Sequence, residues 1–354
     1  MPLNKYKIDL RSDIHNRPTE EMRRAMADAE VGGDALADED PVVLELEETC
    51  AALFEREDAL FVCSGTMGNI VSLLTISRPG CALIADPYTH IISSEVNGFE
   101  RLAGCRLVPI ETDGVLTGEM VHQRLLPCYS DGQTPAVICV ENTHALRGGM
   151  PWGADVAANL ARVAREHGLK LHVDGARIFN AAVAMGQTVA DLTAGADTVQ
   201  VCLSKGLGAP FGSLVVGSKG VIARAREFRR MLGGGMHKPG IMAAAGLVAL
   251  RDMPSRTPDD HRRATRLGSL LEEQEGISLA YPVYTNIIDL LLDPERVDGK
   301  GLVARCAQRG LGITGPWDAP SGQWLRLVTC HEISDDDVET AALIVADALR
   351  ESQR

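Results

Sequence analysis

Between about residues 59 and 218, short apolar runs alternate with helical patterns. Each run is apolar throughout rather than at every second position, which is typical of strands buried on both faces. Between two of these runs, the segment ADVAANLARVAREHG places Val156, Leu160 and Val163 on one helical stripe and ends at Gly168. This alternation predicts an α/β fold with a mostly parallel sheet flanked by helices. The runs are ALFVCSG, CALIAD, CRLVPI, AVICVEN, LKLHVDG, TVQVCLSK and GSLVVGS.

Polar residues gather where these predicted strands end. The short segments SGT, ADP, ENTH, DGAR and SK each follow an apolar run. Because crossover helices place ligand sites at the carboxyl ends of parallel strands, we expect the functional site there.

A second block begins near residue 246. It contains VYTNIIDLLLD, GLVARCAQRGLGI, QWLRLVTC and a helix from about Asp335, which together fit a small α+β domain. We therefore expect a large domain over residues 1–245, with the N-terminal segment, and a small C-terminal domain over residues 246–354.

Charge and cysteine usage exclude several classes of protein. The net charge of −13 argues against general binding to nucleic acid or to anionic membranes. No apolar stretch approaches the roughly 20 residues of a spanning helix, and MPLNKYKIDLRSD lacks the apolar core of a secretory signal. The nine cysteines are scattered and form no CxxC pair. We therefore expect a cytoplasmic protein without disulfides or a metal site.

Lys205 stands at the end of an apolar run in VCLSKGLGAP. Desolvation lowers the pKa of a lysine, and an unprotonated amine attacks carbonyl carbons to form a Schiff base. The alternative is a lysine that marks the exit of the strand to solvent.

Two further strand ends carry candidate binding groups. Gly65 and Thr66, in SGT, begin a predicted helix whose free N–H groups suit a phosphate, although an ordinary helix cap has the same pattern. Asp174 follows a buried strand, where it either forms a structural pair with Arg177 or pairs with a protonated ring nitrogen.

A phosphate turn, an acid and a Schiff-base lysine, in this order, match the needs of pyridoxal 5′-phosphate (PLP). His90 lies between the phosphate turn and the acid, where its ring could stack on the cofactor.

The chain resembles the L-threonine aldolases, PLP-dependent enzymes of the β-eliminating lyase group and of the aspartate aminotransferase-like superfamily. The resemblance covers nearly the whole chain; DGARIFNA and LSKGLGAP are its most specific stretches, and IDLRSD, ALFVCSGTMGN, HIISSE, ENTH and RRMLGGGM also match. It implies the type I fold of PLP-dependent transferases and a homo-oligomer, a dimer or tetramer, with shared active sites. The implied reaction splits β-hydroxy-α-amino acids such as threonine, allo-threonine or phenylserine into glycine and an aldehyde.

The resemblance also implies a role for each matching residue. Lys205 binds PLP covalently and Asp174 pairs with its ring nitrogen, while His90 stacks on the ring and His144 is the second active-site histidine. The phosphate ligands are Gly65, Thr66, Arg229 and Ser204, and the substrate carboxylate is held by Ser12, Arg177 and Arg326. His90 or His144 is the candidate base for the β-hydroxyl proton, because the pKa of imidazole lies near neutral pH.

Four segments depart from the family pattern near the expected site. They are Ile14–His15–Asn16, Leu36–Ala37, His237–Lys238–Pro239 and Thr329–Cys330–His331. More apolar groups on the β-substituent side favour substrates bulkier than threonine, whereas changes at a subunit contact would leave selectivity unaltered.

Two other functions remain open from the sequence. One is a PLP-dependent transaldolase that passes the glycyl unit to another aldehyde. The other is an inactive PLP-binding scaffold, which the presence of Lys205, Asp174 and Arg177 disfavours.

Overall fold

The computed structural model describes residues 6–32, 39–130, 135–319 and 322–351, which form two compact units. The larger unit comprises residues 18–146 and 150–254, and the smaller unit comprises residues 6–17, 147–149 and 255–351, within the described ranges. The domain division at residues 245 and 246 stays a prediction.

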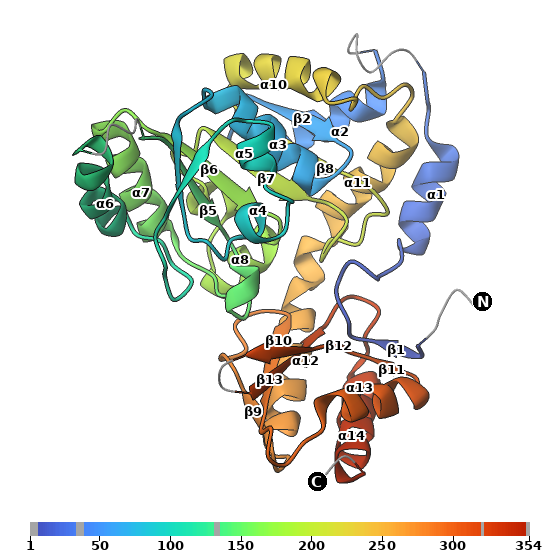
Figure 1. The fold of residues 1–354 in the computed structure, drawn as a ribbon. Helices are drawn as coiled ribbons and strands as arrows, with labels where there is room; N and C mark the ends of the chain where they lie inside the picture. Colours follow the sequence, from blue (N-terminus) through green and yellow to red (C-terminus); the bar gives the residue numbers. More distant parts are fainter. Residues whose placement is uncertain (1–5, 33–38, 131–134, 320–321, 352–354) are drawn as a thin grey trace. The chain divides into compact units, whose positions relative to one another are not determined.

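A seven-stranded sheet forms the centre of the larger unit (Figure 1). Its strand order is β2-β8-β7-β6-β5-β3-β4, and only β8 runs antiparallel to its neighbours. The expected mostly parallel sheet is confirmed, and each of the seven apolar runs contains one of its strands. The strands are β2 (Asp58–Val62), β3 (Ala82–Ala85), β4 (Arg106–Pro109), β5 (Pro135–Glu141), β6 (Lys170–Gly175), β7 (Thr198–Cys202) and β8 (Ser213–Gly217).

Helices cover both faces of this sheet (Figure 1). On one face, alternate strand residues pack against α1, α2, α7, α8 and α11 in one large apolar cluster. On the other face, α3, α4, α5 and α10 pack over two smaller apolar clusters. The helices are α1 (Glu20–Asp28), α2 (Pro41–Leu53), α3 (Gly65–Ile76), α4 (His90–Ser93), α5 (Gly98–Arg101), α6 (Gly118–Ser130), α7 (Ala154–Glu166), α8 (Ile178–Met185), α9 (Val189–Leu192), α10 (Lys219–Met231) and α11 (Gly240–Asp252).

Buried polar side chains lie on the sheet face under α3, apart from these two smaller clusters. His172 and Asp174 are two residues apart in β6 and therefore point to the same face, opposite to Leu171 and Val173. The polar band formed by Asn69, His172, Asp174, Gln200 and Ser213 is thus part of the interior. Burial of so many polar groups is costly unless they are hydrogen-bonded or serve a ligand.

The smaller unit contains a four-stranded antiparallel sheet with the order β12-β13-β10-β9. Its apolar core joins this sheet to α12, α13 and α14, and β1 pairs with β11 in a separate parallel ladder. The sequence indicated β10, β13, α13 and α14 but not the short edge strands β9 and β12. The elements are β1 (Ile8–Asp9), α12 (Thr257–Glu272), β9 (Ile277–Leu279), β10 (Ile287–Leu292), α13 (Gly299–Gln308), β11 (Leu311–Gly312), β12 (Thr314–Ala319), β13 (Gly322–Val328) and α14 (Asp335–Arg350).

None of the helices in the described ranges is long and apolar enough to cross a membrane.

Candidate active site

Six strands of the large sheet run in the same direction, so their carboxyl ends lie at one edge. They are β2, β3, β4, β5, β6 and β7, because β8 alone is reversed, between β2 and β7. Most predicted site residues of the larger unit lie at or directly after these ends. Asp174 is the second-last residue of β6. The others are Gly65 and Thr66 after β2, His90 after β3, His144 after β5, and Ser204 and Lys205 after β7. The fold therefore brings together residues that are far apart in the sequence.

The N-terminus of α3 presents backbone N–H groups at this edge. Ser64 is the N-cap, and its side chain accepts a hydrogen bond from the N–H of Met67. The N–H groups of Gly65 and Thr66 precede the first intrahelical bond, which Gly68 donates to the carbonyl of Ser64. A Cβ on Gly65 would lie 3.2 Å from Nε2 of Gln200. A side chain at position 65 would therefore press against the Gln200 amide, and glycine avoids that contact.

Lys205 lies in a tight turn between β7 and β8 and is half-buried. The N–H of Gly208 donates to the carbonyl of Lys205 at 2.8 Å, and Gly208 has a φ of 74°. At the end of this turn Gly212 has a φ of 92°, and a Cβ there would lie 2.4 Å from Cε2 of Phe61. Gly208 and Gly212 are thus required by the backbone of the turn.

Asp174 is 2% exposed and is held as a hydrogen-bond acceptor. Oδ2 accepts from Nδ2 of Asn69 at 2.8 Å, and Oδ1 accepts from the N–H of Ala176 at 3.0 Å. These two donors fix the orientation of the carboxylate, whose oxygens can also accept a hydrogen bond from a protonated ring nitrogen.

His90 begins α4 and forms a hydrogen bond with a buried acid. Its Nδ1 lies 3.0 Å from Oε1 of Glu95, and this hydrogen bond is the main reason why the pKa of His90 is raised above its usual value. The negative charge of Asp174 also raises that pKa, while burial and the positive charge of Lys205 lower it. One ligand atom from each of His90, Glu95 and Asp174 lies within 4.8 Å of the others, so these groups form a single cluster.

Glu141 connects the segments of the two predicted histidines. Its Oε2 accepts from the N–H of His90 at 2.7 Å, and its Oε1 accepts from the N–H of Ala145 at 2.9 Å. His144 is 2% exposed, and Nε2 lies 3.9 Å from Oδ1 of Asp86. Neither ring nitrogen of His144 forms a hydrogen bond within the part of the chain that the structure describes.

The two other predicted residues of the larger unit lie at helix ends. Arg229, in the last turn of α10, is 2% exposed and donates from Nη1 to the carbonyl of Phe61 at 2.7 Å. This bond places Arg229 near the carboxyl end of β2, where α3 begins. Arg177 is the residue before α8 and is half-buried.

Ser12 and Arg326 belong to the smaller unit. Arg326 lies opposite Asp289 in the β10–β13 ladder. Its Nε and Nη2 each donate to one oxygen of the Asp289 carboxylate at 2.7 Å. The hydroxyl oxygen of Ser12 lies 3.4 Å from the N–H of Ile14, which donates to it. Asp289 therefore sets the orientation of the Arg326 guanidinium.

The groups at the carboxyl edge fit PLP. The amide of Gln200 and the hydroxyl of Ser213 lie next to Gly65 and are buried, with no hydrogen-bond partner among the described residues. An amine on Lys205, an acceptor carboxylate on Asp174 and free N–H groups on α3 supply what the aldehyde, ring nitrogen and phosphate of PLP require. His90, Glu95 and Asp174 alone could also hold a cation, but Lys205 would have no role in such a site.

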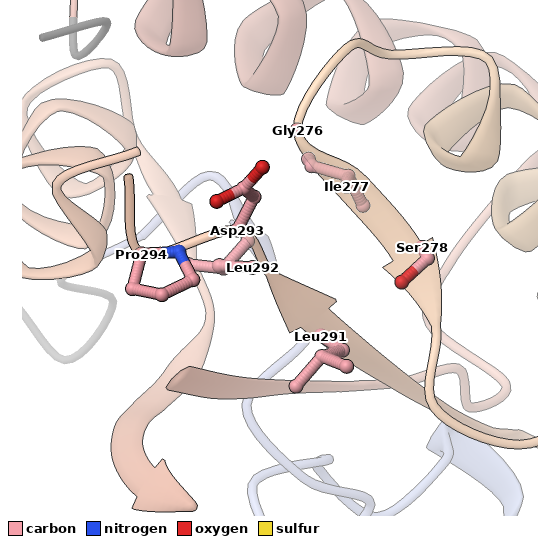
Figure 2. Close-up of a pocket in the computed structure, with 7 residues that line it drawn as sticks. All are labelled: Gly276, Ile277, Ser278, Leu291, Leu292, Asp293 and Pro294. Carbon is pink, nitrogen blue, oxygen red and sulfur yellow. The ribbon is translucent and has the colours of Figure 1, made fainter. Parts of the chain in front are cut away.

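A separate pocket of about 370 Å³ lies in the smaller unit, between β9 and the end of β10 (Figure 2). It contains no predicted site residue, and Asp293 is its only titratable lining residue. A single carboxylate among apolar side chains does not indicate a particular chemistry. The lining residues are Gly276, Ile277, Ser278, Leu291, Leu292, Asp293 and Pro294.

Several contacts of the site residues were not predicted from the sequence. Asn69, Glu95 and His172 form hydrogen bonds in the cluster, and Glu141 and Asp289 hold predicted residues in place. Of these residues, His172 could have been predicted from the sequence, because its position two residues before Asp174 places it on the same face of the strand. Among the departures from the family pattern, Ile14 is 55% exposed, and Leu36–Ala37 lies outside the described residues.

Comparisons with known proteins agree with this geometry. The family model described as beta-eliminating lyase matches residues 9–293. The chain is 39% identical to the low-specificity L-threonine aldolase 1 of Arabidopsis thaliana over 338 residues, which covers 94% of this chain and 93% of the relative. It is 39% identical to the low specificity L-threonine aldolase of Escherichia coli K12 over 268 residues, or 75% of this chain and 79% of the relative. The solved structure of Leishmania major threonine aldolase superimposes with a TM-score of 0.81 and 21% identity over 98% of both chains, which confirms the expected fold.

Proposed function

This chain belongs to the beta-eliminating lyase family, and from that membership we infer that it is a PLP-dependent threonine aldolase, which cleaves threonine to glycine and acetaldehyde. One observation supports the inference most directly. The turn of Lys205, the carboxylate of Asp174 and the N-terminus of α3 all lie at the carboxyl edge of one sheet. The roles of individual residues are our proposals.

When bound, PLP supplies a conjugated ring that takes up the electrons of a bond broken at the substrate Cα. We propose that the Lys205 amine holds it covalently and that the Asp174 carboxylate accepts a hydrogen bond from its ring nitrogen. The N–H groups of Gly65 and Thr66, the Ser204 hydroxyl and the Arg229 guanidinium would bind the phosphate. His90 would stack on the ring, with Glu95 fixing the orientation of its imidazole.

Ser12, Arg177 and Arg326 would bind the substrate carboxylate. A guanidinium binds a carboxylate through two parallel hydrogen bonds, which fixes the rotation about the substrate Cα. That rotation decides which Cα bond is broken. Asp289 supports this role because its two hydrogen bonds fix the orientation of the Arg326 guanidinium.

We propose that His144 accepts the proton of the substrate β-hydroxyl, directly or through one water. Its buried ring nitrogens form no hydrogen bond among the described residues, whereas His90 forms one with Glu95 and has a raised pKa. A base needs a ring nitrogen that can reach the proton it removes, which favours His144. His144→Phe should therefore lower kcat more than His90→Phe, and the reverse order would assign the proton to His90.

Borohydride reduction of the purified protein tests the central proposal. We expect absorbance near about 420 nm, as is usual for lysine-bound PLP, and fixation of the cofactor on the peptide that contains Lys205. Lys205→Ala should abolish cleavage even when added PLP binds, because the covalent link is lost. Label on another lysine would overturn the assignment.

We further propose that β-hydroxy amino acids bulkier than threonine, such as phenylserine, are cleaved with higher kcat/KM. Ile14 stands where the family usually has threonine, and each additional buried methylene contributes about 0.8 kcal/mol. Threonine, allo-threonine, phenylserine and hydroxyaspartate should be compared in one assay of glycine and aldehyde. A clear preference for threonine would contradict the proposal, and transfer to an added aldehyde without release of glycine would indicate a transaldolase.

We also propose that the protein is a homo-oligomer, a dimer or tetramer with shared active sites, and that it works in the cytoplasm. The family resemblance supports the first proposal. For the second, the eight cysteines whose side chains the structure describes are free of disulfides, which suits a reducing compartment.

A further inference from the structure

Asn69 is the centre of the polar band under α3. Its side chain is 1% exposed, and it contacts three buried polar residues. Nδ2 donates to Oε1 of Glu95 at 2.9 Å and to Oδ2 of Asp174 at 2.8 Å. Oδ1 lies 3.0 Å from Nε2 of His172. One amide therefore joins the acid beside His90 to the acid that we assign to the PLP ring nitrogen.

We propose that Asn69 is a positioning residue that holds the carboxylates of Glu95 and Asp174 in place and thereby sets the electrostatic surroundings of the His90 imidazole. The proposal rests on the function inferred above and adds a residue to its site. Oε1 of Glu95 also lies 3.0 Å from Nδ1 of His90, so the Asn69 amide fixes the oxygen that the imidazole contacts. The same NH₂ group donates to Oδ2 of Asp174, which holds the second carboxylate of the cluster in place.

His172 and Thr198 fix the orientation of the Asn69 amide. Because carboxylates only accept hydrogen bonds, the NH₂ group of Asn69 must face Glu95 and Asp174, and its oxygen must face His172. His172 then donates from Nε2, and its Nδ1 accepts from the hydroxyl of Thr198 at 2.9 Å. Burial lowers the pKa of His172 to about 4, so the ring stays neutral and supplies only this one donor.

The strand geometry explains why a single asparagine reaches both residues of β6. His172 and Asp174 point to the same face of the strand, and α3 packs over that face. His172 is also in register with Thr198 in β7. The chain of hydrogen bonds from Thr198 through His172 and Asn69 to the two acids thus depends on the register of β6 with β7.

Removal of the Asn69 donor should lower the pKa of His90. Without that donor, Oε1 of Glu95 is no longer held beside Nδ1 of His90, and the hydrogen bond to Glu95 is the main cause of the raised pKa. The Asp174 carboxylate, whose charge also raises this pKa, loses one of its two donors as well. The other charged groups near His90 are Lys205 and Glu141, which the substitution leaves in place.

The test compares the full-length protein with Asn69→Leu, with and without PLP. Deuterium exchange at the imidazole C2 position, followed by mass spectrometry of the peptide that contains His90, gives its pKa. We expect that pKa to fall in the variant towards the ordinary value of an imidazole, because the hydrogen bond to Glu95 that raises it is weakened. An unchanged pKa in a folded Asn69→Leu protein would overturn the proposal.

Two more variants complete the test. Thr75→Val removes a buried hydroxyl of α3 that donates to the carbonyl of Val71, and it should leave the His90 pKa unchanged. If the His90 pKa falls equally in Thr75→Val and Asn69→Leu, the loss of any polar group in α3 has this effect, and the role of Asn69 is refuted. Thr198→Val removes the donor to His172 and should lower the His90 pKa less than Asn69→Leu. If Asn69→Leu does not fold, an unchanged pKa in Thr198→Val rejects the proposal.

The cofactor-free measurement separates this proposal from the proposed function. Failure of borohydride to label Lys205 would reject the PLP chemistry while leaving the His90 pKa shift interpretable. Conversely, a labelled Lys205 with an unshifted His90 would retain the function and reject the role of Asn69.

Discussion

Asp289, in the smaller unit, forms a buried ion pair with Arg326. It is buried and accepts two hydrogen bonds of 2.7 Å from Arg326. Removing one partner of a buried ion pair leaves the other charge desolvated and unpaired.

Asp289→Ala should therefore lower the free energy of unfolding by about 3 kcal/mol, measured by urea denaturation. It should also raise the KM for the amino acid, because Arg326 loses its orientation. Glu339→Ala is the matched control, since it breaks the exposed pair of Glu339 with Arg266 and should leave the unfolding midpoint unchanged. Equal losses of unfolding free energy in both variants would show that the buried pair stabilises the fold no more than the exposed pair does.

At the level of elements, the start of α3 depends on the absence of a side chain at Gly65. A Cβ there would lie close to the Gln200 amide. Gly65→Ala should weaken PLP binding about tenfold or more, because a lost hydrogen bond to a charged phosphate costs about 1.5–3 kcal/mol. Equilibrium titration of the cofactor-free protein measures the effect.

Gly220→Ala is the matched control for this substitution. Gly220 lies in α10, where a Cβ would meet no atom within 4 Å. Alanine in a helix stabilises the chain by about 0.5–1 kcal/mol relative to glycine, and cofactor affinity should not change. If the Gly65→Ala variant binds PLP as tightly as the parent protein, the N-terminus of α3 does not bind the phosphate.

The burial of His172 makes the free energy of unfolding depend on pH. Burial lowers its pKa from 6.5 to about 4, so between these values the unfolded chain binds more protons than the folded chain. Stability is therefore lost as the pH falls from about 6.5 towards about 4, by up to about 3 kcal/mol.

His172→Gln should flatten this part of the pH profile, measured as urea midpoints between about pH 7 and 4. His122→Gln alters an exposed imidazole and should keep the profile of the parent protein. If His172→Gln also keeps it, the imidazole is not held neutral by burial.

At the level of the whole molecule, an exposed apolar residue follows the His90–Glu95 segment. Val96 is 77% exposed and has a φ of 54°, a backbone conformation that β-branched residues rarely adopt. Contact with a second copy of the chain would remove the Val96 side chain from water.

We expect light scattering to give at least twice the chain mass of 37.9 kDa, and Val96→Asp to shift the protein towards the monomer. Leu343→Asp, at a 67% exposed position of α14, should leave the mass unchanged. A monomeric parent protein would contradict the proposed oligomer, and an unaffected Val96→Asp would place the contact elsewhere.

The sequence by itself determined the strands of the large sheet and the identity of its key groups. Continuous apolar runs are stable only when both faces are covered, so they marked all seven strands. Lys205 and Asp174 were identified because polar groups directly after such runs lie where ligands bind. These inferences depend on neighbours in the chain and therefore need no tertiary information.

Only the tertiary structure decided which distant residues meet. The pairing of β8 between β2 and β7, the contact of Asn69 with Asp174 across 105 positions, and the pairing of Arg326 with Asp289 depend on strand order and register. Many pairings satisfy the same apolar pattern, and a local pattern does not distinguish them. Register and packing select one arrangement, because buried polar groups such as Asn69 and Asp289 are stable only where their hydrogen-bond partners lie within reach.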